Sequence, residues 1–269
     1  MRLTAVRRDV SSLRRDDARD PALVRTFGLL LGRGCIAPPQ VAPWHQLVTA
    51  PHGRALVRTD AAVFPLIAGS GAWIPSGVAY SIEFAGAGEV RLLYLRPEAA
   101  AHVEPALLHI TPLLRELIAR TVALGALDGR IPAHRRLAAV VTDEVAASHE
   151  IQLRLPLPAS GPARAAAEML LGADAQALRI GDGTQTPSID DVARLCGTSR
   201  RTLERAFARD LGMGLAAWLR RARFIDALYA LRSGASVTAA ALEAGYAAPS
   251  AFIAAFRREF ATTPGAYRK

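Results

Sequence analysis

The sequence predicts a mixed α+β protein with an N-terminal β-barrel, a helical segment and a C-terminal all-helical domain. Short apolar runs broken by Gly and Pro occupy residues 27–97, which is typical of closely spaced strands. Apolar residues then follow a helical period over residues 98–151, and two helix-turn-helix patterns come after them. A chain of 269 residues is long enough for two domains.

The barrel is assigned to residues 1–100, although roughly the first 25 are charged and expected to be only half ordered. Beyond them, apolar runs recur at short and fairly even spacing, and Gly or Pro stands near many of their ends. The expected strands are Phe27–Leu31, Gln46–Thr49, Ala55–Thr59, Ala72–Pro75, Tyr80–Phe84 and Val90–Leu95. Strands of this number and length favour a small barrel or sandwich.

Residues 101–158 are expected to form a helical linker. One apolar stripe joins Leu113, Leu114, Leu117, Ile118 and Val122, and another joins Leu137, Val140, Val141 and Val145. Residues 155–158 alternate Leu and Pro, which indicates an extended connection. Such stripes could dimerise, transmit a signal or pack on the chain's own barrel, and the sequence leaves these three alternatives open.

The third segment, residues 159–269, contains the first helix-turn-helix pattern at residues 188–209. Ser188 and Ser199 are good helix N-caps, and Gly197 allows the sharp turn between the two helices. In the second helix Leu203 and Phe207 lie one turn apart and are expected in the core. The polar residues on the other side of that helix are Arg201, Glu204 and Arg205.

A second pattern of the same kind follows at residues 236–260, with Gly245 at its turn. Phe252 and Phe256 repeat the spacing of Leu203 and Phe207, each 49 residues later (252 − 203 and 256 − 207). Residues 215–231 between the patterns carry an apolar stripe, which predicts a buried connecting helix. Such a helix would hold the two helix-turn-helix units at a fixed separation. If both units bind successive major grooves of DNA, their recognition helices lie about 34 Å apart.

Charge supports a polyanionic partner. The chain has 33 basic and 24 acidic residues, a net charge of +9 and a pI of about 10.6. Residues 188–269 hold 13 basic and 7 acidic residues, so +6 of this charge lies there. Nearly all cations are arginine, whose planar fork suits phosphates and guanine edges.

Residues 188–269 resemble the AraC/XylS family of bacterial transcription regulators, and the run from Ala240 to Arg268 is similar to the family signature almost throughout. The resemblance implies sequence-specific binding to double-stranded promoter DNA, contact with RNA polymerase in an activator, and no catalysis. The base-contacting residues that it implies are Arg201, Glu204, Arg205, Ser250 and Ile253. The expected phosphate contacts are Ser199, Arg200, Arg220, Arg221, Arg257 and Arg258.

The N-terminal half resembles the cupin-like sensor domain that many of these regulators carry, through residues 44–48, 53–59 and 72–80. The resemblance implies a pocket for a small-molecule effector. Its expected lining is Trp44, His45, Gln46, Trp73, Tyr80 and Glu83. Where relatives often have metal-binding histidines, this chain has Gln40, Ala42 and Tyr80, so neither a metal nor another cofactor is expected.

Two alternatives remain open. The chain could be a constitutive DNA-binding regulator whose barrel serves only dimerisation, and whether it forms a homodimer is not decided. A cupin enzyme is the weaker alternative, because it needs clustered His and Glu ligands and the six histidines are scattered. Two cysteines give no disulfide framework, and the sequence shows neither an export signal nor a membrane span. A cytoplasmic bacterial protein, on the nucleoid when bound, is therefore expected.

Overall fold

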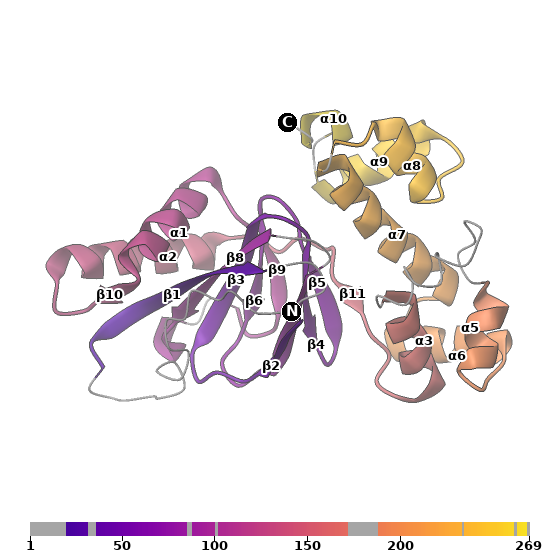
Figure 1. Ribbon diagram of the computed structural model, residues 1–269, viewed down its shortest axis with the longest axis horizontal. Coiled ribbons are helices and arrows are strands. Elements are labelled where there is room, and N and C mark those ends of the chain that lie inside the picture. The colour runs from indigo at the N-terminus through magenta and orange to yellow at the C-terminus, as the bar shows by residue number, and fades with distance from the viewer. Residues whose placement is uncertain are drawn as a thin grey trace. The chain divides into compact units, whose positions relative to one another are not determined.

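The computed structural model describes residues 20–31, 36–84, 88–99, 102–171, 188–232, 234–260 and 263–267. The chain divides into two compact units, and its fold is of the mixed α+β class (Figure 1). The first unit comprises Met1–Thr59 and Phe64–Arg154, and the second comprises Asp60–Val63 and Leu155–Lys269. No helix in the described ranges is long and apolar enough to span a membrane.

Two antiparallel sheets build the strand-rich part of the molecule. A six-stranded sheet has the order β10-β1-β8-β3-β6-β9, and a five-stranded sheet has the order β11-β5-β4-β7-β2. The strands of the first sheet are β1 (Ala22–Leu31), β3 (His45–His52), β6 (Ser70–Ile74), β8 (Gly88–Leu95), β9 (Ala106–His109) and β10 (Ala126–Asp128). Those of the second are β2 (Ile36–Gln40), β4 (Ala55–Thr59), β5 (Ala62–Leu66), β7 (Tyr80–Phe84) and β11 (Leu155–Pro156).

Both faces of the six-stranded sheet are buried, so its central strands are nearly continuous runs of buried residues. Leu47 pairs with Trp73 across β3 and β6, and both belong to the hydrophobic cluster beneath the helices. Their neighbours Gln46 and Ile74 pair with each other and face the opposite way, towards the five-stranded sheet. Alternation along β3 therefore separates a helix-covered core from an interior between the sheets.

Two helices cover the outer face of the six-stranded sheet: α1 (Pro112–Leu124) and α2 (Pro132–Ala147) (Figure 1). Thr111 caps α1 by accepting a hydrogen bond from the amide of Leu114. The helix residues that pack on Leu47 and Trp73 are Leu114, Ile118, Val141 and Val145. Of the three alternatives for residues 101–158, the structure thus shows packing on the chain's own sheet.

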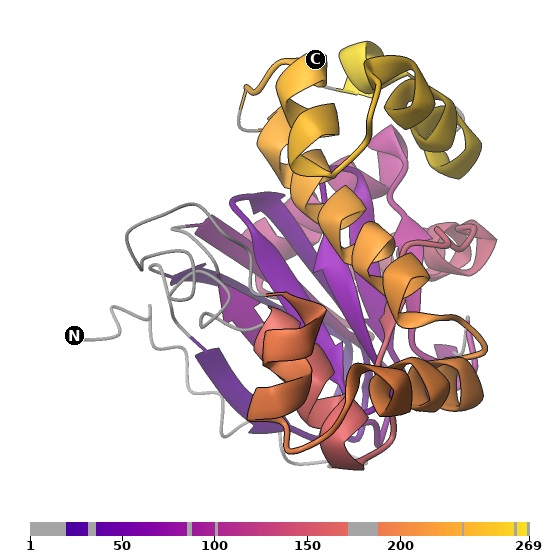
Figure 2. The same cartoon turned by 90° about the vertical axis from the view of Figure 1, so that its right-hand side faces the viewer.

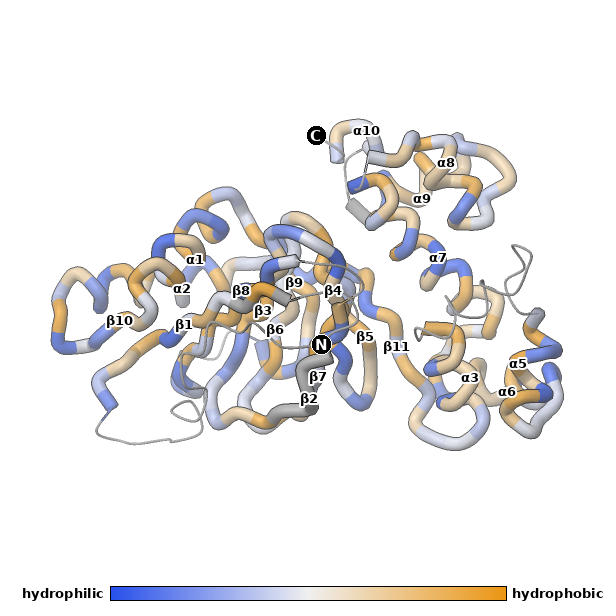
Figure 3. The backbone as a smooth tube through the Cα atoms, in the orientation of Figure 1, coloured by the Kyte–Doolittle hydropathy of each residue, from blue (hydrophilic) through white to orange (hydrophobic). Residues whose placement is uncertain are grey.

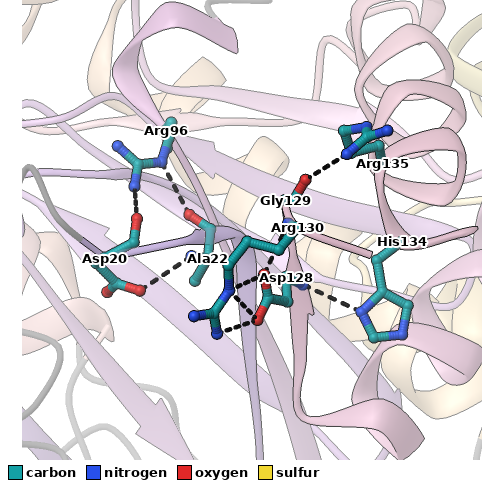
Figure 4. A network of polar contacts seen from close by, with 8 residues as sticks. All are labelled: Asp20, Ala22, Arg96, Asp128, Gly129, Arg130, His134 and Arg135. Atoms are coloured by element: carbon teal, nitrogen blue, oxygen red, sulfur yellow. Dashed lines mark hydrogen bonds and ion pairs between the residues drawn. The ribbon is translucent and has the colours of Figure 1, made fainter. Parts of the chain in front are cut away.

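A polar network closes the edge of this sheet where β1 meets β10 (Figure 4). Arg130 donates to both carboxylate oxygens of Asp128, and these hydrogen bonds lower the pKa of Asp128 to about 2. His134 Nδ1 accepts from the amide of Asp128, which ties α2 to the same turn. Arg96, the residue after β8, donates to the carbonyl of Ala22 at 2.8 Å. The side chains therefore satisfy backbone groups that the sheet edge leaves exposed.

A stacked histidine pair is expected to make the stability of the first unit pH-dependent. The rings of His109 and His149 lie 5.2 Å apart and nearly parallel, and Nδ1 of His109 is buried with no hydrogen-bond partner among the described residues. Burial first, and then the charge of His149, lowers the pKa of His109. The unfolded chain therefore takes up the proton first as the pH falls below about 6.5.

The thermal midpoint is accordingly expected to fall as the pH is lowered from about 7.5 to 5.5, because stability present above the unfolded pKa is lost as the pH falls through the folded pKa. In the His109→Gln variant this pH dependence should be shallower. His52→Gln, which removes an exposed ring, is the control and should keep the wild-type slope. Identical slopes in all three proteins would contradict the assignment.

The second unit is mainly helical. In the part that the structure describes, its helices are α3 (Gly161–Leu171), α5 (Ile189–Leu195), α6 (Arg200–Leu211), α7 (Leu215–Arg232), α8 (Val237–Glu243), α9 (Pro249–Phe260) and α10 (Pro264–Tyr267). Figure 2 shows α7 running from the α5–α6 pair to the α8–α9 pair. The expected connecting helix and both helix-turn-helix units are thereby confirmed.

The Leu-Pro connection is part of the core of the second unit. Leu155 and Pro156 pair with Val63 and Ala62, and Leu157 donates its amide to the carbonyl of Ala61. Arg164 of α3 donates to the carbonyl of Asp60 at 2.5 Å. The indole Nε1 of Trp218, in α7, donates to the carbonyl of Pro156 at 2.7 Å. These hydrogen bonds explain why residues 60–63 belong to this unit.

Candidate nucleic-acid interface

The first helix-turn-helix unit begins with a capping box. The Ser188 hydroxyl accepts from the amide of Asp191, while the Asp191 carboxylate accepts from the amide and hydroxyl of Ser188. These hydrogen bonds lower the pKa of Asp191, and the carboxylate suits the positive end of the helix dipole. Gly197 makes the turn with φ of 65°, in the left-handed region that favours glycine. The predicted cap and turn are confirmed.

The second helix of this unit, α6, separates its core residues from its polar residues. Leu203 and Phe207 are buried, and the Phe207 ring packs edge-on against Trp218 of α7 at 5.4 Å. Arg201 and Arg205 lie one turn apart on the opposite face, and both are exposed. Because the aromatic anchor fixes the rotation of α6, these two guanidinium groups are held outward, where a DNA groove can reach them.

Glu204 and Arg200 lie at the edge of that outward face and bind each other. Arg200 Nε donates to Glu204 Oε1 at 2.9 Å, and Arg200 Nη1 lies 3.9 Å from Asp190 Oδ2 of α5. The hydrogen bond to Glu204, followed by the charges of Glu204 and Asp190, raises the pKa of Arg200. Ser199 caps α6, and its hydroxyl interacts with Thr202 at 2.9 Å. Both expected phosphate contacts, Ser199 and Arg200, thus have protein partners.

The second unit repeats the architecture with different chemistry. Ser236 caps α8, Gly245 makes the turn with φ of 78°, and Phe252 and Phe256 are buried. Phe224 of α7 packs against both rings, at 5.6 and 6.1 Å. This cluster confirms the duplicated plan that the 49-residue spacing predicts.

The outer face of α9 is mostly apolar. Ser250 and Ala254 are exposed, and Ile253 is half-buried. Figure 3 shows the contrast in hydropathy between α6 and α9. Arg257 and Arg258 are exposed in the last turn of α9, away from its N-terminal end. Of the two base contacts expected on this helix, Ser250 has a hydrogen-bonding side chain and Ile253 does not.

The connecting helix α7 carries further cations. Arg220 is exposed, whereas Arg221 is half-buried. The Arg223 guanidinium lies at the α8–α9 turn, where a Cβ added to Gly245 would come within 3.1 Å of its Nη1. Arg223 thus lies beside the C-terminal end of α8, where the helix dipole favours a positive charge.

A family model described as a helix-turn-helix domain matches residues 192–269. The chain is 28% identical to the HTH-type transcriptional regulator NimR of Escherichia coli K12 over 223 residues, 82% of this chain and 78% of NimR. The HTH-type transcriptional regulator RipA of Corynebacterium glutamicum is 31% identical over 112 residues, 42% of this chain and 31% of RipA. This chain is a DNA-binding transcription regulator of the helix-turn-helix type.

A solved structure also resembles this regulator, though weakly. Unsaturated fatty acid-bound ToxT of Vibrio cholerae matches 94% of this chain and 96% of its own, with 13% identity and a TM-score of 0.34.

Three of the six expected pocket residues have structural partners outside the interior between the sheets. His45 accepts from the amide of Ser76 at Nδ1, and its Nε2 lies 3.0 Å from the carbonyl of Pro97. Trp73 donates to the carbonyl of His102 within the helix-covered core. Glu83 is ion-paired with Arg58 at 2.7 Å, on the half-buried face of the five-stranded sheet. Both His45 nitrogens are engaged, as in a structural histidine.

Gln46 and Tyr80 do face the interior, where the Tyr80 hydroxyl donates to Gln46 Oε1. Tyr94, which the sequence analysis missed, pairs with Gln46 across β3 and β8 and lies on the same face. Burial raises the pKa of Tyr94 to about 12, against the opposing effect of a hydrogen bond with Tyr80. Trp44 lies two residues before Gln46, and the guanidinium carbons of Arg25 and Arg96 are 5.0 and 5.1 Å from the centre of its ring.

Metal ligation finds no support in the side chains. Among the described residues, no group of three or more His, Cys, Asp or Glu could hold a metal ion. Of the positions where relatives carry histidines, Ala42 and Tyr80 are buried, and the side chain of Gln40 lies outside the described part. The interior instead offers neutral hydrogen-bonding groups.

Proposed function

We propose that this chain is a transcription regulator of the AraC type, and that it recognises an asymmetric operator in which α6 supplies most of the base discrimination. The supporting observation is the outward face of α6, where Arg201 and Arg205 stand one turn apart, opposite the buried Leu203 and Phe207. Arginine can make two parallel hydrogen bonds to the O6 and N7 of guanine in the major groove. The expected half-site for α6 therefore contains guanines one or two base pairs apart.

The second recognition helix, α9, adds apolar contacts to bases and ionic contacts to the DNA phosphates. Ile253 and Ala254 can touch thymine methyl groups but cannot donate to a base edge, and Ser250 can bind a base or a phosphate. Arg257, Arg258, Arg220 and Arg221 are proposed phosphate contacts that position the protein without reading sequence. The half-site for α9 should accordingly be thymine-rich and less strictly defined.

Selection of bound fragments from the fragmented source genome tests this proposal. The purified protein should enrich a motif that spans two successive major grooves, with one stringent and one degenerate half. Genes beside the enriched sites would indicate the regulated process, and their expression in a deletion strain would separate activation through RNA polymerase from repression. Binding that is weak, sensitive to salt and independent of sequence would contradict base reading by α6 in the unliganded protein.

We also infer that the interior between the two sheets binds a small-molecule effector. The supporting observation is Gln46, which is 0% exposed and whose Nε2 has no hydrogen-bond partner among the described residues. A buried donor without a partner costs free energy, about 1–3 kcal/mol, which a bound acceptor would recover. Tyr80 and Tyr94 beside it supply further polar groups for orienting a ligand.

A thermal-shift screen with sugars, amino acids and small carboxylic acids tests the effector. A ligand that raises the melting temperature of the wild type should fail to do so in the Gln46→Leu variant, and it should change the affinity for the selected operator. Tyr94→Phe, which keeps the ring, should give an intermediate response. A ligand that stabilises both proteins equally would place the site elsewhere. No response to any compound would favour the constitutive alternative, in which the N-terminal unit only dimerises.

A further inference from the structure

Arg200 is the one expected phosphate contact on α6 whose charge already has two carboxylate partners among the described residues. Its guanidinium donates to Glu204 at 2.9 Å and lies 3.9 Å from Asp190. By contrast, neither Arg201 nor Arg205 forms an ion pair with a carboxylate in the part of the chain that the structure describes. Of these three arginines of α6, Arg200 is therefore paired with carboxylates, whereas Arg201 and Arg205 are not.

Helix stability does not explain this arrangement. Arg200 is the first residue of α6, where the positive end of the helix dipole disfavours a cation. In i,i+4 pairs, the order that stabilises a helix best places the acid before the base, and here the order is reversed. Both side chains are about half exposed, so the pair itself stabilises the fold little.

The Glu204 carboxylate can form hydrogen bonds with few base edges. A carboxylate is only an acceptor, and it is repelled by the phosphates around it unless a cation accompanies it. In the major groove, guanine and thymine present acceptors, and adenine presents N7 beside its amino group. Cytosine N4 is the donor that a carboxylate meets without an adjacent acceptor on the same base.

We propose that Arg200 and Glu204 form a specificity gate, in which Arg200 positions the Glu204 carboxylate to accept from a cytosine amino group. On DNA without that cytosine the pair stays closed, and Arg200 adds no phosphate contact. The pair thereby weakens binding to random DNA while it selects one base pair. This inference rests on the proposed role of α6 as the main reading helix.

Salt dependence on random-sequence duplex DNA tests the closed state. Glu204→Gln releases Arg200, so binding to random DNA should tighten, and the slope of log K against log salt should steepen by about 0.9, the value for one added phosphate contact. Glu243→Gln is the matched control, because it removes one exposed carboxylate from α8 of the same domain. Equal slopes for the wild type and both variants would overturn the gate.

Selection from a random DNA library tests the preference for cytosine. The wild type should enrich a cytosine at one position of the α6 half-site, and Glu204→Gln and Arg200→Gln should each lose that preference. Arg200→Lys, which keeps the charge, should restore part of it. Circular dichroism checks that the exposed substitutions leave the fold intact.

The outcomes separate this inference from the proposed function. If Arg201→Ala and Arg205→Ala change the selected motif while Glu204→Gln leaves it unchanged, α6 reads bases and the gate is wrong. If none of these substitutions changes the motif, the role of α6 itself is wrong.

Discussion

Replacing Trp218 by alanine is expected to destabilise the DNA-binding unit by about 3–5 kcal/mol, the range for a fully buried tryptophan. Trp218 is 0% exposed, its ring packs on Phe207 of α6, and its indole donates to the carbonyl of Pro156. The substitution thus leaves a cavity, and the half-buried carbonyl of Pro156 loses its donor. The free energy of unfolding of a domain of this size is about 5–15 kcal/mol, so the substitution removes a large part of it. Hydrogen exchange of α6 and α7 in the intact chain would measure the loss.

Trp73 provides a matched control for that experiment. It is also 0% exposed and donates its indole N–H to a backbone carbonyl, that of His102 at 2.9 Å, but it lies in the first unit. Trp73→Ala should increase exchange in β3 and β6 and leave α6 and α7 near wild type. Trp218→Phe, which keeps an aromatic ring, should cost less than Trp218→Ala. Unchanged protection of α6 in Trp218→Ala would contradict the role assigned to this side chain.

Replacing either of the two outward arginines of α6 is expected to have the second large effect, on the specificity of DNA binding. Arg201→Ala or Arg205→Ala should reduce discrimination between the selected operator and random DNA by roughly 1–3 kcal/mol, or about fivefold to more than a hundredfold, because a bidentate pair with guanine is lost. Both side chains are exposed, so neither substitution should lower the thermal midpoint appreciably. Titrations on operator and random duplexes at one fixed salt concentration measure the ratio.

Arg220→Ala is the control for charge alone. This exposed arginine on α7 is expected to contact phosphate, so its loss should weaken operator and random DNA by the same factor. Equal losses on both duplexes for Arg201→Ala and Arg205→Ala would show that these residues also bind only phosphate. The base-reading assignment would then be wrong.

The helix-turn-helix units were predictable because their signals are local. Ser188 caps α5 through an amide three residues away, Gly197 makes a single turn, and Leu203 and Phe207 share a face through helical spacing. Each of these features depends on neighbours within one or two helical turns. The same is true of Phe252 and Phe256, so both units can be predicted without any tertiary contact.

The pairing of strands was not local, and there the prediction was incomplete. The apolar runs predict β1, β3, β4, β6, β7 and β8, but they do not predict β2, β5, β9, β10 and β11. β10 and β11 are three and two residues long, and the Leu-Pro segment reads as a simple connection until its pairing with Val63 and Ala62 is seen. Strands this short have too few residues to show a period, and they exist only because a partner lies beside them.

The sequence by itself determined the two reading units, their connecting helix and the aromatic anchors that hold them, since caps, glycine turns and helical periods act over a few residues. Only the tertiary structure decided which side of a sheet each candidate residue faces. Gln46 and Leu47 are adjacent in the chain, yet one faces Tyr80 and the other packs under α1 and α2. That outcome depends on strand register, because a shift of one residue exchanges the two faces. Likewise, only the folded geometry showed that Glu204 holds Arg200 while Arg201 and Arg205 point outward.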